Sequence, residues 1–363
     1  MKSKLKIAFL LSIITERGGI GRVTSIISNE LNNHPDFDIH IISYARKKEN
    51  SYDWNNKLPY HYLLEEQIPM KKGIITASKK LKNILSTNNI DILISSGAIV
   101  GPLGVLGTVF NKTKLIYWSH SSFKGTSKKQ FRMFNEHFTA LFAKCIVSLT
   151  KTDEVNYAKE TRAKKVVQIY NPIDSKLENN DKEYSSTSKK IVSVGRLTAQ
   201  KNFETLIDVA AIVLSEHKDF TWDIYGSGEE EDLLQKKIKT NNLIGKVNLM
   251  GQSSNLYELY NEYALMVMTS KYEGFPMSLI EGLASNLPLV SFDIPTGPNE
   301  IIHEGTNGFL IEPFDVADMA KKISILINDE DLRISFSKKN PKLINEFNLS
   351  TITKKWITLL NKL

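Results

Sequence analysis

Cysteine is almost absent from this 363-residue chain, in which Cys145 is the single example. One cysteine forms no intramolecular disulfide and cannot build a cysteine-rich metal site, so both of these are excluded. Long apolar runs are also missing, since none reaches the roughly 18 residues that a membrane-spanning helix needs. These absences favour a soluble globular protein in a reducing, cytoplasmic setting.

The opening stretch places lysines before apolar residues, which is the order found in a signal peptide. Lys2, Lys4 and Lys6 precede the apolar run 7–14, but a polar glycine turn at 15–21 follows where a small-residue cleavage site would stand. An apolar run that ends in such a turn is typical of the first buried strand of an α/β domain. We therefore interpret this stretch as a strand.

Positive charge is concentrated in one half of the chain. The net charge is +7, yet residues 1–175 hold 26 Lys and Arg against 14 Asp and Glu, and the remainder holds 21 against 26. The composition is otherwise ordinary, with 41% hydrophobic and 24% charged residues, which argues against extensive disorder. The asymmetry predicts an anionic partner near the N-terminal half, for which nucleic acid and a phospholipid surface are both candidates.

The length suits two domains, and each half of the chain repeats the same alternation of short apolar strands and longer amphipathic helices. Such alternation predicts right-handed crossovers and a parallel sheet in each domain. A polar stretch without apolar periodicity, 174–190, is interpreted as the linker. The predicted strands are 7–14, 39–44, 90–95, 114–118 and 145–149, then 191–194, 221–225, 247–249, 265–268 and 289–292, with helices that include 21–31, 74–85 and 349–363.

The most informative stretch is 268–291, which divides into a strand, a polar loop, a helix, a turn and a second strand. Pro276 suits the first helical turn, where its missing N–H costs nothing. The amides of Gly274, Phe275 and Met277 then lie at a helix N-terminus, which attracts an anion or a sugar oxygen. Gly274 also permits close approach of a ligand.

Two carboxylates accompany this helix, Glu273 just before it and Glu281 within it. Their spacing is too wide for a shared proton, so we interpret them as hydrogen-bond acceptors for hydroxyls on different parts of one extended ligand. The alternative is that Glu273 is a solvated loop charge and Glu281 a surface residue of the helix, since exposed carboxylates are common.

A cationic pair follows the first strand of the second domain. Arg196 leaves the carboxyl end of that strand, where open α/β sheets bind ligands, and Lys201 follows before a helix that starts near Asn202. Both are able to reach one diphosphate and to stabilise the charge that develops on a departing nucleoside diphosphate. The alternative is two solvated cations at a sheet edge.

The first domain offers two weaker signals. Gly18, Gly19 and Gly21 follow its first strand and open a helix, so their amides can approach phosphate or sugar, although the loop lacks the pattern of a P-loop or a dinucleotide fingerprint. His120 sits just past an apolar strand, where it can donate a hydrogen bond to a ligand. The alternative for a lone histidine is a structural role.

Two further motifs are set aside. The glycines at 226–228 precede three glutamates, 229–231, which favour a helix N-terminus but repel an anionic ligand. The acidic triplet 329–331 follows an amphipathic helix rather than ending a strand, so we assign it to solvent and predict no essential metal.

Taken together, these residues resemble glycosyltransferase family 4, the retaining enzymes of the GT-B fold, over nearly the whole length. The resemblance rests on Glu273 and Glu281 with seven residues between them, on His120, and on the stretches 18–21, 171–174, 195–202 and 305–310. It implies an α/β GT-B fold, in which two Rossmann-like domains face each other across a cleft. Residues 1–172 would bind the acceptor, 173–345 the nucleotide sugar, and the helix in 346–363 would return to the N-terminal domain.

The same resemblance implies a role for each site residue. Arg196 and Lys201 would bind the donor diphosphate, Glu273 and the backbone after it the transferred sugar, and Glu281 the ribose. His120 would hydrogen-bond the donor sugar, and the glycine loop would lie beside phosphate and acceptor. The implied set is catalytic His120, Arg196, Lys201 and Glu273, with donor-binding Gly18, Gly19, Gly21, Gly195, Gly274, Phe275, Pro276, Met277 and Glu281, and with no metal or cofactor.

The stretch 292–302 is similar to bacterial transferases that build capsule, lipopolysaccharide or teichoic-type glycans. This similarity implies a UDP-sugar donor and a glycan or undecaprenyl-diphosphate-linked glycan acceptor. The glycine loop departs from the commoner Gly-Gly-x-Glu-Arg form. We expect a cytoplasmic enzyme at the inner face of the membrane, with an interfacial helix that mixes Lys128, Lys129 and Arg132 with Phe131, Met133, Phe134, Phe138, Leu141 and Phe142. The alternative is an ordinary amphipathic helix packed on its own sheet.

Two functions other than sugar transfer would each explain part of the sequence. A UDP-sugar epimerase has the same overall fold and would turn over its substrate without an acceptor. A basic nucleic-acid-binding protein would explain the positive N-terminal half, but not the acidic second half or the two-carboxylate helix, and no nucleic-acid motif is present. We therefore expect a glycosyltransferase without a nucleic-acid partner.

Overall fold

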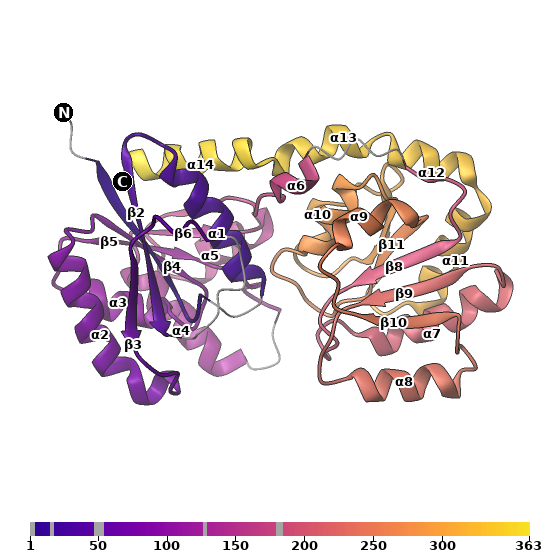
Figure 1. Ribbon diagram of the computed structural model, residues 1–363, viewed down its shortest axis with the longest axis horizontal. Helices are drawn as coiled ribbons and strands as arrows, with labels where there is room; N and C mark the ends of the chain where they lie inside the picture. Colours follow the sequence, from indigo (N-terminus) through magenta and orange to yellow (C-terminus); the bar gives the residue numbers. More distant parts are fainter. Residues whose placement is uncertain (1–3, 15–17, 47–53, 126–128, 179–183) are drawn as a thin grey trace. The chain divides into compact units, whose positions relative to one another are not determined.

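The computed structural model of the chain describes residues 4–14, 18–46, 54–125, 129–178 and 184–363. The chain divides into two compact units (Figure 1). Unit 1 contains Met1–Pro172 and Leu349–Leu363, and unit 2 contains Ile173–Asn348. Each unit has one parallel sheet with helices packed on it, so the predicted α/β architecture with two sheets is confirmed.

Unit 1 is built on a seven-stranded parallel sheet with the order β3-β2-β1-β4-β5-β6-β7. The order reverses between β1 and β4, which is the kind of position where open α/β sheets bind ligands. The strands are β1 (Leu5–Leu11), β2 (Phe37–Ala45), β3 (Tyr60–Leu64), β4 (Ile92–Ser96), β5 (Lys114–Trp118), β6 (Cys145–Ser148) and β7 (Val166–Gln168). The helices are α1 (Gly19–Asn32), α2 (Met70–Thr87), α3 (Gly101–Thr108), α4 (Lys129–Phe142), α5 (Lys151–Glu160) and α14 (Leu349–Asn361).

The C-terminal helix α14 is part of unit 1, as the fold prediction expected. Its apolar side chains recur at helical spacing and are buried, among them Ile352, Trp356, Leu359 and Leu360. The ring of Trp356 packs edge-on against that of Trp118 in β5, with centroids 4.9 Å apart. Burial of this large aromatic pair explains why a helix so far along the chain joins the first sheet.

Unit 2 repeats the arrangement on a six-stranded parallel sheet with the order β10-β9-β8-β11-β12-β13. Its strands are β8 (Lys190–Val194), β9 (Thr221–Tyr225), β10 (Val247–Gly251), β11 (Leu265–Met268), β12 (Leu289–Phe292) and β13 (Gly308–Ile311). Its longer helices are α7 (Phe203–Glu216), α8 (Glu231–Thr240), α10 (Met277–Ala284), α11 (Val316–Asn328) and α12 (Glu330–Ser337). Its short ones are α6 (Ser175–Glu178), α9 (Leu256–Leu259), η1 (Tyr260–Glu262), η2 (Pro298–Glu300), α13 (Asn340–Leu343) and η3 (Ile344–Phe347).

The prediction that the polar stretch 174–190 is a linker is wrong, because this stretch belongs to unit 2. Its described part makes hydrogen bonds to that unit. The hydroxyl of Tyr184 donates to the carbonyl of Ala264 at 2.6 Å, and Arg333 donates to the carbonyl of Ser186 at 2.6 Å. A polar segment attached through hydrogen bonds leaves no apolar periodicity in the sequence.

The predicted strands all occur, but three further strands escaped sequence analysis. Tyr60–Leu64 lies at the edge of its sheet and is mostly half-buried, while Val166–Gln168 and Gly308–Ile311 span only three and four residues. Short or half-exposed strands lack a long apolar run. Within the described ranges, no helix combines the length and the apolar character needed to cross a bilayer.

The packing of α14 generates a stability prediction. Replacing Trp356 with alanine removes the ring that packs on Trp118 and leaves a cavity, so W356A should lower the free energy of unfolding by about 3–5 kcal/mol. Urea denaturation of the full chain measures this. Lys354 is exposed on the same helix, and K354A is the control, expected within about 0.5 kcal/mol of the parent. Equal stability of both variants would contradict the assignment of α14 to the unit 1 core.

Candidate functional site

The candidate site of unit 2 lies where the strand order reverses, between β8 and β11. These two strands are parallel neighbours, with Ile191 opposite Leu265 and Val192 opposite Met266. Because parallel strands end at the same edge of a sheet, the loops 195–202 and 269–276 leave side by side. This reversal of strand order marks the position at which open α/β sheets hold ligands.

The structure joins two predicted residues across these loops. The Nζ of Lys201 lies 2.6 Å from Oε1 of Glu273, and the two side chains are only 16% and 8% exposed. The backbone carbonyl of Glu273 accepts a hydrogen bond from Thr296 at 2.6 Å, and Gln200 donates to the carbonyl of Tyr272 at 2.9 Å. A charge-assisted, largely buried contact of this kind is strong, and its position is fixed from both loops. The alternatives of a solvated Glu273 and a solvated Lys201 are wrong.

Two local features place Lys201 over the end of β8. Asn202 adopts a left-handed backbone conformation with φ 57° and donates to the carbonyl of Thr269 at 3.2 Å, which turns the chain into α7. Gly195 provides the space, because a Cβ atom there would lie only 3.0–3.1 Å from three methylene carbons of Lys201. The lysine side chain therefore lies across the glycine, which leaves room for this close approach.

Arg196 differs from Lys201 in its surroundings. Its side chain is exposed, and in the described part of the chain it forms no ion pair. The turn that carries it is nevertheless fixed, since the amide of Gly195 donates to Tyr225 at 3.0 Å and that of Leu197 to Ser227 at 3.0 Å. The guanidinium is thus held on a rigid turn with its charge available to an anion.

The glycines at 226–228 support this turn. A Cβ atom at Gly226 would lie 1.8 Å from the carbonyl oxygen of Gly195, and one at Gly228 would lie 2.2 Å from that of Leu197. Gly226 also has a φ of +141°, which L side chains rarely adopt. These glycines therefore allow two backbone segments to touch.

Helix α10 begins at Met277 and presents its N-terminus at the same edge. Pro276 was expected in the first turn but is the N-cap residue, with an extended ψ of 98°. Its ring packs against Gly297, where a Cβ atom would lie 2.5 Å from the proline Cδ. The amides of Met277 and Ser278 have no intrahelical acceptor, because a helix leaves its first N–H groups unpaired. Only Phe275 and Pro276 separate them from Glu273 and Gly274.

Glu281 is buried on α10 and is not the surface residue of the alternative interpretation. Its Oε2 accepts a hydrogen bond from the hydroxyl of Tyr260 at 2.7 Å. A buried carboxylate with a fixed donor keeps acceptor capacity for a further hydroxyl. Glu273, in the loop before α10, and Glu281, on α10, are therefore both buried carboxylates.

Unit 1 holds the remaining predicted residues. Gly18 and Gly19 start α1, and Arg17 beside them falls outside the described residues. Added Cβ atoms at Gly18 and Gly19 would meet nothing within 4 Å, so packing does not require these glycines. Neither a side-chain cap nor an acidic residue occupies the first turn, while Gly21 is buried within the helix. The N-terminus of α1 is thus electrostatically suited to an anion.

His120 follows β5 and stacks at an angle on Trp118, with ring centroids 4.3 Å apart. Its Nε2 atom is buried and has no hydrogen-bond partner in the described structure. Burial lowers the pKa of His120 to about 3, so the ring is neutral at physiological pH. An unpaired buried nitrogen of this kind is costly, and a ligand hydroxyl would satisfy it.

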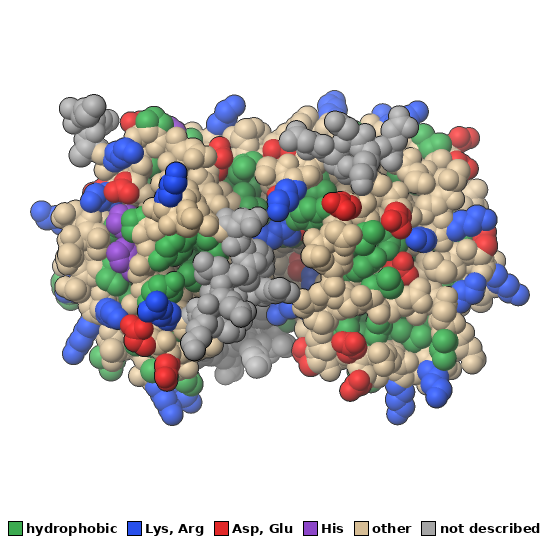
Figure 2. All heavy atoms as spheres, in the orientation of Figure 1, with side chains coloured by type: hydrophobic (Ala, Val, Ile, Leu, Met, Phe, Trp, Pro, Cys, Tyr) green, Lys and Arg blue, Asp and Glu red, His purple; other side chains and the backbone are tan. Residues whose placement is uncertain are grey.

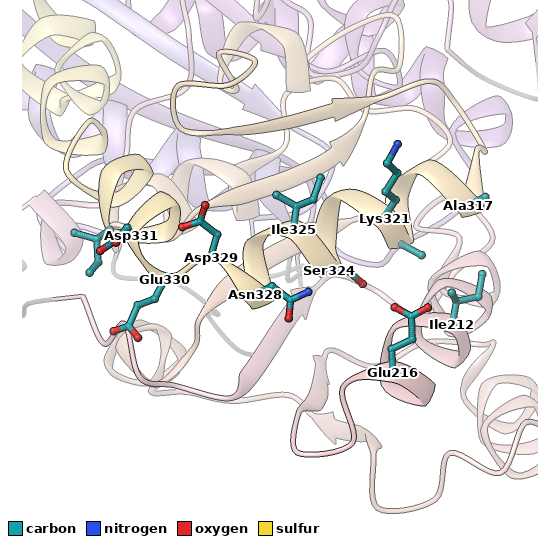
Figure 3. Close-up of a pocket in the computed structure, with 12 residues that line it drawn as sticks. Ile212, Glu216, Ala317, Lys321, Ser324, Ile325, Asn328, Asp329, Glu330 and Asp331 are labelled. Atoms are coloured by element: carbon teal, nitrogen blue, oxygen red, sulfur yellow. The ribbon is translucent and has the colours of Figure 1, made fainter.

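The acidic triplet 329–331 lies away from the candidate site. Figure 3 shows Asp329, Glu330 and Asp331 beside a surface pocket between α7, α11 and α12, with Glu216 of α7 across from them. Asp329 caps α12 by accepting from the amide of Leu332 at 2.8 Å. Because α7 starts at the Lys201 edge and rises about 1.5 Å per residue, its end at Glu216 is about 20 Å away.

Comparisons with known proteins relate the chain to glycosyltransferases. Residues 174–343 match the sequence model of the family described as Glycosyl transferases group 1. A Haemophilus influenzae protein named uncharacterized glycosyltransferase is 27% identical over 363 residues, covering 98% of this chain and 99% of its own length. The amylovoran biosynthesis glycosyltransferase AmsD of Erwinia amylovora is 29% identical over 370 residues, covering 98% and 99%.

Solved structures share the fold. A Staphylococcus aureus TarM mutant in complex with Fondaparinux, alpha-GlcNAc-glycerol and UDP superposes with a TM-score of 0.82 at 19% identity, over 98% of this chain and 100% of that chain. This likeness establishes the GT-B fold, and the sequence matches favour a transferase over the epimerase and the nucleic-acid binder considered from the sequence.

Several residues of the site escaped sequence analysis. They share the task of fixing a predicted residue, and none has a distinctive spacing. They are Gln200, Asn202, Tyr260, Thr269, Thr296 and Gly297. Only Asn202 gave a signal, since asparagine is a residue that tolerates left-handed backbone conformations.

The glycine contact generates a second stability prediction. G226A drives a Cβ atom into the carbonyl of Gly195 and strains the backbone, so it should cost well over the roughly 1–2 kcal/mol of a positive φ alone. Gly245 has a φ of +73° with nothing within 4 Å of an added Cβ, so G245A measures that conformational cost by itself. Urea denaturation compares the two. Equal losses of unfolding free energy in G226A and G245A would mean that the contact at Gly226 does not support the Arg196 turn.

Proposed function

We propose a specific reaction for this chain, which is a glycosyltransferase with the GT-B fold. It moves a hexose or N-acetylhexosamine from a UDP-sugar to a glycan or undecaprenyl-diphosphate-linked glycan, in the synthesis of a bacterial surface polysaccharide. The full-length similarity to an amylovoran biosynthesis enzyme supports the pathway class, and the UDP bound to a protein of the same fold supports the donor.

The observation that carries the proposal is the contact between Lys201 and Glu273 beside the exposed Arg196. Two cations and a carboxylate stand at one sheet edge, and the N-terminus of α10 adds amide donors. A nucleoside diphosphate sugar needs this combination, because its diphosphate requires positive charge and its sugar hydroxyls require acceptors.

Each side chain then has one task. Arg196 and Lys201 hold the diphosphate, and Glu273 binds sugar hydroxyls together with the backbone of 274–277. Glu281, oriented by Tyr260, accepts from the ribose hydroxyls. In unit 1, the loop with Gly18, Gly19 and Gly21 supplies amides to phosphate and acceptor, and the neutral His120 hydrogen-bonds the transferred sugar.

The reaction proceeds with retention, as in glycosyltransferase family 4. The bond between the sugar C1 and the phosphate oxygen breaks, and UDP leaves with the electron pair. The acceptor oxygen bonds to C1 from the same face and gives its proton to the departing phosphate. The charge of Arg196 and Lys201 stabilises this leaving group, so most of the catalysis is electrostatic. No divalent metal takes part, and chelation with EDTA leaves the rate unchanged.

Replacing Arg196 tests the leaving-group role. R196A should lower kcat by about 10²–10³-fold, because one preorganised charge at the developing anion is lost. Its thermal midpoint should stay at the parent value, since the exposed side chain forms no ion pair in the described structure. Exposed Lys271 on the neighbouring loop gives the control K271A, which should retain its rate. The assay measures UDP release with and without an acceptor glycan. Near-parent activity of R196A would contradict the leaving-group role of Arg196.

Replacing Glu273 separates a ligand contact from a structural contact. E273Q keeps the shape but frees Lys201 from its carboxylate, so the affinity for UDP alone should rise while sugar transfer falls by about 10²-fold or more. Calorimetric titration with UDP and the transfer assay report the two quantities. A parallel loss of both would show that Glu273 only maintains the loop.

The donor itself is tested by thermal shift with UDP-, GDP- and ADP-sugars. A ligand that binds the folded state raises the melting temperature by mass action, so UDP-sugars should give the largest rise. A larger rise with a GDP- or ADP-sugar would replace the donor in the proposal. UDP-sugar turnover that needs no acceptor would instead support the epimerase.

A further inference from the structure

The outward face of α4 is apolar. Met133, Phe134, Leu141 and Phe142 are 39%, 65%, 42% and 46% exposed, although they occupy helix positions that normally carry polar side chains. The inward positions are taken by other residues, since Thr139 and Ala140 are buried. The helix therefore packs on its sheet and still presents an apolar second face, which marks an interaction surface.

Three phenylalanines form the centre of this face, and we call Phe134, Phe138 and Phe142 the aromatic ladder. The rings of Phe134 and Phe138 stack with centroids 6.0 Å apart, and those of Phe138 and Phe142 lie 5.2 Å apart. Phe138 is partly buried against the core of unit 1, so it anchors the two outer rings. The ladder is thus an ordered feature of a helix with fixed packing.

The surface around the ladder carries no negative charge from its own segment. Between Asp91 and Asp153, the sequence contains eight Lys and Arg residues and only one acidic residue, Glu136. That carboxylate is buried, with Oε2 accepting from Tyr157 at 2.5 Å and Oε1 lying 3.4 Å from Nε of Arg132. The exposed side chains that α3, α4 and their loops contribute are therefore apolar, neutral or basic.

The excess of positive charge extends to the whole of unit 1. Its sequence, 1–172 with 349–363, holds 29 Lys and Arg against 13 Asp and Glu. Figure 2 shows Lys and Arg side chains projecting from the outline of unit 1. The same acid-poor segment contributes further exposed apolar residues, Ile99, Leu106 and Phe110. Apolar exposure and a scarcity of acidic residues thus coincide in one stretch of sequence.

We propose that α4 docks unit 1 on an anionic phospholipid bilayer, with the aromatic ladder at the acyl boundary and basic side chains of unit 1 at the headgroups. An ordered apolar stripe on a unit with a large excess of positive charge has the chemistry of an interfacial helix. Basic residues near an anionic membrane surface add electrostatic attraction to the apolar contact. Lys128 and the side chains of Lys129 and Phe131 fall outside the described residues and do not enter the argument. The inference does not depend on the donor or the acceptor of the reaction.

Vesicle co-sedimentation of the full chain tests the docking. The probe is a vesicle of phosphatidylglycerol and phosphatidylcholine, compared with one of phosphatidylcholine alone. The parent protein should bind the anionic vesicle, and raised salt should weaken the binding. The double variant F134S/F142S should bind at least about tenfold more weakly, because the exposed rings supply the apolar contact.

Two controls separate binding through the ladder from general apolar binding and from unfolding of the variant. Ile244 is 71% exposed in unit 2, so I244S removes an exposed apolar side chain elsewhere and should bind like the parent. An unchanged melting temperature of F134S/F142S shows that the fold is intact, and parallel losses in both variants would overturn the proposal. Parent-like vesicle binding by F134S/F142S would also overturn the proposal, as would the absence of parent binding to anionic vesicles. Two further results would assign the face to another partner. One is a dimer in light scattering that F134S/F142S dissociates, and the other is a salt-sensitive shift with a generic oligonucleotide that depends on the ladder.

Discussion

The ion pair between Lys201 and Glu273 is the contact on which the candidate site depends. It joins the loops that follow β8 and β11, at the edge where the strand order of unit 2 reverses. The ion pair is not mainly a source of stability, because a buried ion pair offsets the cost of its desolvation only when the geometry is good. Its consequence is positional, since one short contact fixes a cation and an acceptor together next to Arg196 and α10.

Small residues make that contact possible. Gly195 lets the stem of Lys201 lie across the backbone, and Gly226 lets β9 end against the Arg196 turn. Thr296 and Asn202 then fix the two loops by hydrogen bonds. The site is therefore preorganised by the close backbone contact at Gly226 and by the hydrogen bonds that fix its two loops.

Sequence analysis predicted the fold well because buried parallel strands leave continuous apolar runs, as at 114–118 and 265–268. It also placed Lys201 and Glu273 at strand ends, where topology brings them together. It did not find Thr296 or Tyr260, because a residue that orients another through one hydrogen bond carries no periodic signal. The stretch 174–190 was misassigned for the same reason, since polar attachment resembles a linker in sequence.

A crystal structure of the chain with UDP tests the central claim most directly. The account predicts that the diphosphate lies within hydrogen-bonding distance of both Arg196 and Lys201, with the ribose hydroxyls on Glu281. UDP bound elsewhere on the chain, or bound at this edge without contact to either cation, would contradict it.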